Sequence, residues 1–229
     1  MLYKETVAPG TLALIKELMD DELMVNFNLV GGTALSLLIG HRQSIDIDLF
    51  CDTSFDASTL AEHLQNKYQA EDIRTLKNGI FCYIRQVKVD ILAHKYPLLK
   101  PIVMDEGIRM LSLEDIGAMK LSAITDSGQR LKDFVDLYKL LEFRPLSVLL
   151  EAFENKYPDV SGKIAIKAIN FYDEILPQEI KFFGKKLTMD EISKRLYAAT
   201  VDPKRIFKDK YQKQQVKKVI LKKSRRRKL

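Results

Sequence analysis

The stretch Asn28-Leu-Val-Gly-Gly-Thr-Ala-Leu-Ser-Leu-Leu-Ile-Gly-His-Arg-Gln-Ser-Ile-Asp-Ile-Asp-Leu-Phe50 decides the fold of this chain. An apolar run at 27–30 and a glycine pair precede a segment at 33–39 that has apolar residues at helical spacing. A polar turn at 40–44 then leads into an alternating segment at 45–49. This order predicts a strand, a tight turn, a helix and a second strand.

Two aspartates share one face of the second predicted strand. Alternate side chains of a strand point to the same side. The segment therefore directs Ile45, Ile47 and Leu49 into the core, while Asp46 and Asp48 project from the other face. Two close carboxylates repel each other unless a divalent cation lies between them, and hard oxygen ligands suit magnesium. A solvated strand end is the alternative interpretation.

The glycine pair Gly31-Gly32 opens the predicted helix. A glycine turn lets backbone N–H groups approach an anion, and a helix N-terminus favours negative charge. Taken alone the pair indicates only a turn, but before an Asp-x-Asp strand it indicates a phosphate site beside a metal site. In the polar turn, Arg42 or Ser44 could contact phosphate, whereas His41 is expected to shape the turn without a catalytic role.

A helix at 57–68 and three short strands at 70–76, 80–85 and 87–92 follow. Asn78-Gly79 is a strong signal for a β-hairpin between the first two of these strands. The segment 93–111 contains two prolines and is too broken for a long element, although 102–104 could form one more short strand.

Asp90 is a candidate third carboxylate. In the strand at 87–92, Val87, Val89 and Ile91 share one face and Asp90 projects from the other. An exposed strand acid is the plain interpretation. Beside an Asp-x-Asp pair, however, a third acid can hold a second metal ion or act as a base.

The region from 112 onward is predicted to be helical. Ser112-Leu-Glu-Asp115 resembles a capping box, and the helix that it begins runs to about 125 with Lys120 in the middle of its apolar face. This lysine either extends past the core to water or faces an acid or phosphate.

A second helix at 130–142 places Lys132 and Asp136 at positions i and i+4 on its outer side, where they could form a surface pair. Asp133 lies at the edge of the apolar side of this helix. Helices at 146–157, 161–175 and 190–200 are expected to follow.

The charge of the chain is unevenly distributed. Residues 204–229 hold thirteen Lys or Arg residues and one acid, a net charge of +12, which leaves −6 on the rest because the whole chain carries +6. Such a run neutralises phosphates and favours RNA, although a solvated tail is the alternative. The segment 204–229 could be a basic amphipathic helix or a disordered arm.

The composition is that of a globular protein of the reducing cytoplasm. The chain has 229 residues, of which 46% are hydrophobic and 30% charged. No apolar run approaches the ~20 residues of a membrane span, and the N-terminus lacks the pattern of a signal peptide. The two cysteines, Cys51 and Cys82, are expected to be buried free thiols.

Two blocks of the sequence resemble one known family. The first is Gly31-Gly-Thr-Ala-Leu35 with Gly40-His-Arg-x-Ser-x-Asp-Ile-Asp-Leu-Phe50. The second is Ser112-Leu-Glu-Asp-Ile-x-Ala-Met-Lys120-Leu with Lys132-Asp-x-x-Asp136-Leu-Tyr. Both look like motifs of the AbiEii/AbiGii-type toxin nucleotidyltransferases, a branch of the DNA polymerase β-like nucleotidyltransferase superfamily. The resemblance covers roughly residues 25–142, and Lys132 stands where the family often has arginine.

The resemblance implies a mixed α/β (α+β) nucleotidyltransferase fold: a small mixed sheet flanked by helices and followed by a C-terminal helical region. We expect a catalytic domain at 1–110, a helical domain at 111–203 that completes the cleft, and a basic tail at 204–229.

The resemblance also implies transfer of a nucleoside monophosphate from an NTP to an acceptor hydroxyl, with Mg²⁺, expected as two ions, held by Asp46, Asp48 and Asp90. The expected catalytic residues are Asp46, Asp48, Asp90, Lys120 and Asp136. The expected NTP-binding residues are Gly31, Gly32, Thr33, Arg42, Ser44, Lys120, Lys132 and Asp133.

Many members of the family are toxins of type IV toxin–antitoxin or abortive-infection systems, and some modify the 3′ end of tRNA. A cognate antitoxin and a tRNA or other RNA acceptor are therefore expected partners. Two other hypotheses stay open: a catalytically silent module that binds a nucleotide or a partner, and a nucleotidyltransferase that modifies a protein.

Overall fold

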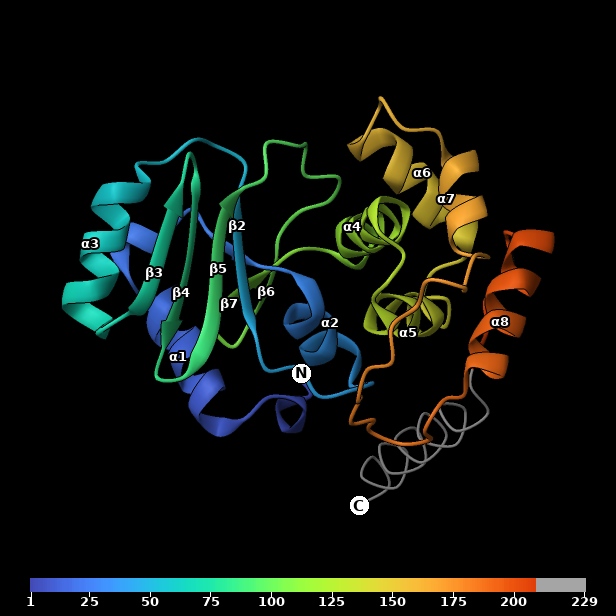
Figure 1. The fold of residues 1–229 in the computed structure, drawn as a ribbon, viewed down its shortest axis with the longest axis horizontal. Helices are drawn as coiled ribbons and strands as arrows, with labels where there is room; N and C mark the ends of the chain where they lie inside the picture. Colours follow the sequence, from blue (N-terminus) through green and yellow to red (C-terminus); the bar gives the residue numbers. More distant parts are fainter. Residues whose placement is uncertain (209–229) are drawn as a thin grey trace, which may run out of the picture.

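The computed structural model describes residues 1–208 (Figure 1). Within them, one mixed sheet of seven strands has the order β3-β4-β5-β2-β1-β7-β6. β2 pairs in parallel with β5, and β1 with β7, while the other neighbours are antiparallel. The strands are β1 (Asn28–Leu29), β2 (Ile47–Cys51), β3 (Glu71–Leu76), β4 (Gly79–Ile84), β5 (Val87–Ala93), β6 (Val103–Asp105) and β7 (Ile108–Met110).

Helices flank the sheet and then continue beyond it (Figure 1). The helices are α1 (Pro9–Met19), α2 (Gly31–Ile39), α3 (Ala57–Tyr68), α4 (Leu113–Asp126), α5 (Leu131–Leu140), α6 (Leu146–Lys156), α7 (Gly162–Ala168) and α8 (Met189–Val201). The predicted fold class is confirmed, since strands and three of these helices precede residue 111 and the others follow it. The division into domains stays a prediction, and most of the predicted tail, 209–229, lies outside the described residues.

Local chemistry explains why these elements begin where they do. The Asp56 carboxylate accepts hydrogen bonds from the N–H groups of Ser58 and Thr59 and so caps α3, and the Ser112 side chain caps α4 in the same way. The hairpin between β3 and β4 turns at Asn78, whose φ of +63° lies in the left-handed region that asparagine tolerates. These predicted starts and this hairpin are confirmed.

Two expectations about local structure were wrong. Ile45 is 57% exposed, because regular strand structure begins only at Ile47. The predicted helix at 161–175 ends at Ala168, where the Asn170 side chain donates to the carbonyl oxygen of Ile166 at 2.8 Å. The short strand expected at 102–104 is present as β6, and β7, which was not expected, pairs with it in a hairpin that turns through Glu106 and Gly107 at positive φ.

The two cysteines are buried and free, as predicted. Within residues 1–208, no helix has the length and apolar character that crossing a membrane requires.

A buried ion pair fastens the helical region to the loop after β5. Lys156 of α6 is fully buried, and its Nζ donates to Asp115 Oδ1 at 2.9 Å and to the carbonyl oxygen of Pro97 at 2.6 Å. Asp115 also accepts from the backbone N–H groups of Leu99 and Lys100. Removing one partner of such a pair leaves an uncompensated buried charge.

The change Lys156→Met should therefore lower the free energy of unfolding by about 3–5 kcal/mol, as measured by urea denaturation. The matched control Lys163→Met, on the exposed face of α7, should change it by less than about 0.5 kcal/mol. A loss below about 1 kcal/mol for Lys156→Met would show that this contact does not hold the two parts together.

Candidate active site

A cleft of about 240 Å³ lies between the sheet and the helices α4 and α5. The sheet and the residue just before β2 contribute three aspartates and Lys88, whereas α4, α5 with its N-cap residue, and the turn before β2 contribute the other cations and Asp133. Its charged lining residues are Arg42, Asp46, Asp48, Lys88, Asp90, Lys120, Arg130, Lys132 and Asp133. The structure thus brings together residues that are far apart in the sequence.

The acidic side of the cleft is built by the two central strands. β2 and β5 pair in parallel with Asp48 directly beside Asp90, and Asp46 immediately precedes β2. Ile47 and Leu49 anchor β2 in the core, so the aspartates between and before them project into the cleft. This part of the predicted arrangement follows from the period of two along a strand.

The ionisation of Asp48 costs free energy. Burial raises its pKa to about 6, and the charges of Asp90 and Asp46 add to this effect while Lys120 opposes it. One oxygen of Asp90, Oδ2, accepts from Lys88 Nζ, whereas the buried Oδ1 has no hydrogen-bond partner among the described residues.

The donor chemistry of this acidic group fits a divalent cation. Carboxylates that repel each other and a buried oxygen without a partner are both relieved by a hard cation. Within residues 1–208, no three His, Cys, Asp or Glu side chains form a metal-binding group. Metal binding by Asp46, Asp48 and Asp90 therefore stays a prediction that their chemistry favours.

The glycine turn lies directly against this acidic group. Gly31 has a φ of +66°, and a Cβ there would lie 2.3 Å from Asp48 Oδ2, so only glycine fits. A Cβ on Gly32 would lie 2.5 Å from Nη2 of Arg42. Both glycines line the cleft at the N-terminus of α2, where backbone N–H groups can receive an anion.

Thr33 and Ser44 have different positions. Thr33 is buried, and its hydroxyl donates to the carbonyl oxygen of Asp46, so it holds the start of the Asp-x-Asp segment in place. Ser44 lines the cleft beside Gly32. The structure therefore brings Ser44, but not Thr33, to the surface where a phosphate would bind.

Lys120 faces acids and does not extend past the core to water. Its Nζ lies 2.7 Å from Asp133 Oδ1 and 2.7 Å from Asp136 Oδ2, and both acids belong to α5. Burial alone would lower the pKa of Lys120, but the two carboxylates raise it above its ordinary value. The lysine is thus a fixed positive charge in the wall of the cleft.

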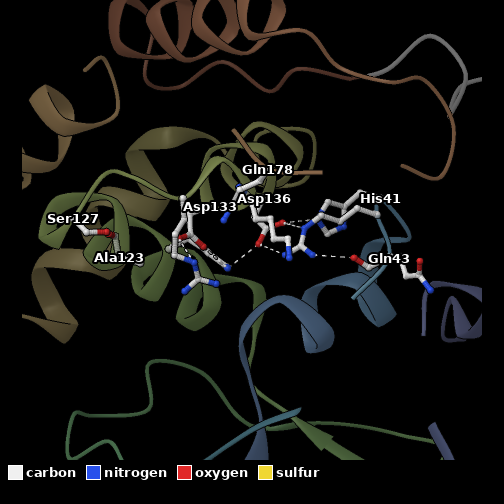
Figure 2. A network of polar contacts seen from close by, with 11 residues as sticks. His41, Gln43, Ala123, Ser127, Asp133, Asp136 and Gln178 are labelled. Carbon is white, nitrogen blue, oxygen red and sulfur yellow. Dashed lines mark hydrogen bonds and ion pairs between the residues drawn. The ribbon is translucent and has the colours of Figure 1, made fainter. Parts of the chain in front are cut away.

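Asp136 is the centre of a buried polar network (Figure 2). It is fully buried, and it accepts from Arg42 Nε at 2.6 Å and from Arg42 Nη2 at 2.9 Å in a bidentate pair. Burial alone would raise the pKa of Asp136, but the charges of Arg42 and Lys120 hold it well below its ordinary range. The expectation of an exposed Lys132–Asp136 pair was wrong, because the turn before β2 covers this face of α5.

His41 completes the network from the same turn. Its Nε2 lies 2.7 Å from Asp136 Oδ1, and Figure 2 shows the ring reaching toward that carboxylate. Burial lowers the pKa of His41, although Asp136 opposes this, so the ring is neutral at pH 7 and Nε2 donates. His41 therefore shapes the turn, as the sequence predicts.

The segment between α7 and α8 covers this network. It forms backbone hydrogen bonds from Gln43 N to Lys181 O and from Phe183 N to His41 O. At its other end, Leu176 N donates to Gln129 O, next to the start of α5. The helical region thus holds the turn before β2 from two sides.

Most of the predicted site residues reach one cleft. Arg42, Asp46, Asp48, Asp90, Lys120, Lys132, Asp133, Gly31, Gly32 and Ser44 line it, whereas Thr33 and Asp136 lie behind its surface. Sequence reasoning missed Lys88, Arg130 and Phe50. The signal for Lys88 was present, since it lies two residues before Asp90 on one strand and shares its face.

Comparisons with known proteins identify the family and the fold. The chain matches the family described as "Nucleotidyl transferase AbiEii toxin, Type IV TA system" over residues 13–213. It is 28% identical over 155 residues to an uncharacterized protein of Aquifex aeolicus strain VF5, a match that covers 65% of this chain and 75% of that protein.

Two solved structures from Helicobacter pylori share the fold. One, titled a putative nucleotidyltransferase, has a TM-score of 0.52 at 19% identity over 87% of this chain and 92% of that one. The other, JHP933, has a TM-score of 0.50 at 20% identity over 93% of this chain and 94% of that one.

The raised pKa of Asp48 predicts that neutralising it stabilises the unliganded protein. Because its pKa of about 6 exceeds the ordinary 3.8, ionisation at pH 7.5 costs stability that is regained as the pH falls from 6 to 4. Asp48→Asn should raise the free energy of unfolding by about 1–2 kcal/mol at pH 7.5 and by much less at pH 4.

The measurement is urea denaturation at both pH values without divalent metal, with Asp173→Asn, an exposed acid, as the control. An Asp48→Asn variant that is no more stable than the parent at pH 7.5 would contradict the electrostatic account of this cleft.

Proposed function

Since this chain belongs to the AbiEii nucleotidyl transferase toxin family, we propose that it transfers a nucleoside monophosphate from an NTP to the terminal hydroxyl of an RNA. The new bond joins the acceptor oxygen to the α-phosphorus, and pyrophosphate leaves. The observation that carries this proposal is a single cleft in which Asp46, Asp48 and Asp90 lie together with a set of cationic side chains. The cleft lies beside the N-terminus of α2, which begins with two glycines.

The triphosphate would lie between the glycine turn and the cations. Backbone N–H groups at Gly31 and Gly32 can receive phosphate oxygens, and Ser44 and Arg42 line the same side. Lys132 of α5 also lines the cleft, and within residues 1–208 its ammonium group has no ion pair. It is therefore available for a phosphate when substrate binds.

The buried Lys120 would contribute a fixed charge that needs no reorganisation during the reaction. Asp133 and Asp136 hold its ammonium group in place, and both belong to the helix that forms one wall of the cleft. Preorganised charge of this kind stabilises the transition state of phosphoryl transfer. Asp136 is a positioning residue in this proposal, since Arg42 and Lys120 lie between it and the cleft.

Asp46, Asp48 and Asp90 would hold magnesium. When bound, magnesium supplies charge neutralisation for the triphosphate and lowers the pKa of a hydroxyl that it contacts. Asp90, at the outer side of this group, would accept the proton of the acceptor hydroxyl. Asp48 would be ionised in the loaded site, because the positive charge of the cation would offset the burial and the neighbouring carboxylates that raise its pKa.

The biological role follows from the family. We propose that the chain is a cytoplasmic toxin, that a cognate antitoxin neutralises it, and that tRNA is an acceptor. The net charge of +12 over residues 204–229 supports a nucleic-acid partner, and two buried free thiols suit a reducing compartment.

The test is incubation of the purified chain with each radiolabelled NTP, magnesium and total tRNA. The parent should transfer label to RNA with at least one NTP. Asp48→Ala should reduce transfer roughly a hundredfold or more, the scale of losing a key electrostatic group, because the triphosphate then lacks its counterion. Asp173→Ala, a change of the same charge on the exposed surface, should retain full transfer.

Three results would contradict the proposal: no label transfer with any NTP, transfer that Asp48→Ala leaves intact, and label that appears only on protein.

A further inference from the structure

One face of the strands β3, β4 and β5 continues the floor of the cleft. These strands lie side by side at the end of the sheet away from α4 to α8 (Figure 1). Ile80, Cys82 and Ile84 of β4 are buried in the core, so Phe81 and Tyr83 point to the opposite face. The register pairs Phe81 with Asp90 and Tyr83 with Lys88, and both of those partners line the cleft.

This face carries aromatic and cationic groups together. Arg74 of β3 pairs in register with Phe81, and its guanidinium lies 5.1 Å from the centroid of the Phe81 ring. Tyr83 is 42% exposed, and the Lys88 side chain is 44% exposed. We call Arg74, Phe81, Tyr83 and Lys88 the outer platform.

The chemistry of the outer platform suits unpaired nucleotides. Bases stack on aromatic rings and on arginine guanidinium planes, while lysine and arginine attract the phosphates. One acid, Glu71, pairs with Tyr83 in the register and marks the outer edge of this surface. Leu76, which is 58% exposed, adds apolar surface beside it.

The geometry also gives the platform a direction. Asp90, Phe81 and Arg74 form one row across three neighbouring strands, so the row is about 10 Å long. A strand of RNA that stacks along this row ends at Asp90, the carboxylate nearest to it among the three acids. That is where an attacking hydroxyl is needed.

On the premise of the proposed nucleotidyl transfer, we propose that the outer platform binds the last unpaired bases of an RNA and delivers its 3′ hydroxyl to Asp90. The acceptor would thus enter over β4 and β3, while the NTP occupies the other side of the acidic group, between the glycine turn and α5.

The test measures binding of a 5′-fluorescein-labelled single-stranded RNA of about ten nucleotides to the full chain by fluorescence anisotropy. A salt concentration near 0.2 M weakens contacts made only through phosphate charge. Arg74→Ala, Phe81→Ala and Tyr83→Ala should each weaken binding by about five- to a hundredfold, because each loses a stacking contact. NTP affinity, measured separately by equilibrium dialysis, should not change.

Matched controls lie on the far side of the molecule. Tyr197→Ala removes an aromatic ring that is 64% exposed on α8, and Lys163→Ala removes an exposed cation on α7; both should bind RNA within twofold of the parent. If Phe81→Ala unfolds, the exposed Arg74 and Tyr83 variants still decide the outcome.

RNA affinity that is unchanged in Arg74→Ala and Tyr83→Ala, or equally reduced in Tyr197→Ala, would overturn the platform. Blunt duplex RNA that competes as well as single-stranded RNA would also overturn it. These binding results are independent of turnover, so a failure of nucleotidyl transfer would refute the proposed function by a separate measurement.

Discussion

The cleft depends on the buried carboxylate of Asp136. This one group accepts a bidentate pair from Arg42, a hydrogen bond from His41 and an ion pair from Lys120. Two of these partners come from the turn before β2 and one from α4, while Asp136 itself belongs to α5. A charge buried this deeply is tolerated only with such partners, so the sheet and the helical region are constrained to meet in one arrangement.

The same constraint explains the distribution of charge in the site. The central strands supply acids that repel one another, which costs stability, and the helical region supplies Lys120, a cation that is already paired and fixed, together with Lys132. Under the proposed function, the divalent cation would pair with the acids and the polyphosphate would pair with the cations. The group of carboxylates that repel one another is thus also the group that we propose as the substrate site. Such a cost in stability is common in active sites.

Much of this site could be predicted from sequence because its signals are local. The alternation of Asp46 and Asp48 with apolar residues, the Asn78 hairpin and the Ser112 cap each depend on neighbours in the chain. Contacts between distant segments were not predictable in this way. A helical projection places Asp136 on the outer side of its helix, and the approach of Arg42, 94 positions earlier, buries it. Likewise, the pattern of residues around Thr33 does not predict that its hydroxyl donates to the carbonyl oxygen of Asp46.

The most direct test of this account is a double-mutant cycle on Arg42 and Asp136, measured as free energies of unfolding for Arg42→Gln, Asp136→Asn and the double variant. The account predicts that each single change costs about 3–5 kcal/mol and that the double change costs at least about 2 kcal/mol less than their sum. Additivity within about 0.5 kcal/mol would show that the pair does not couple the two halves of the cleft, and it would contradict the central claim.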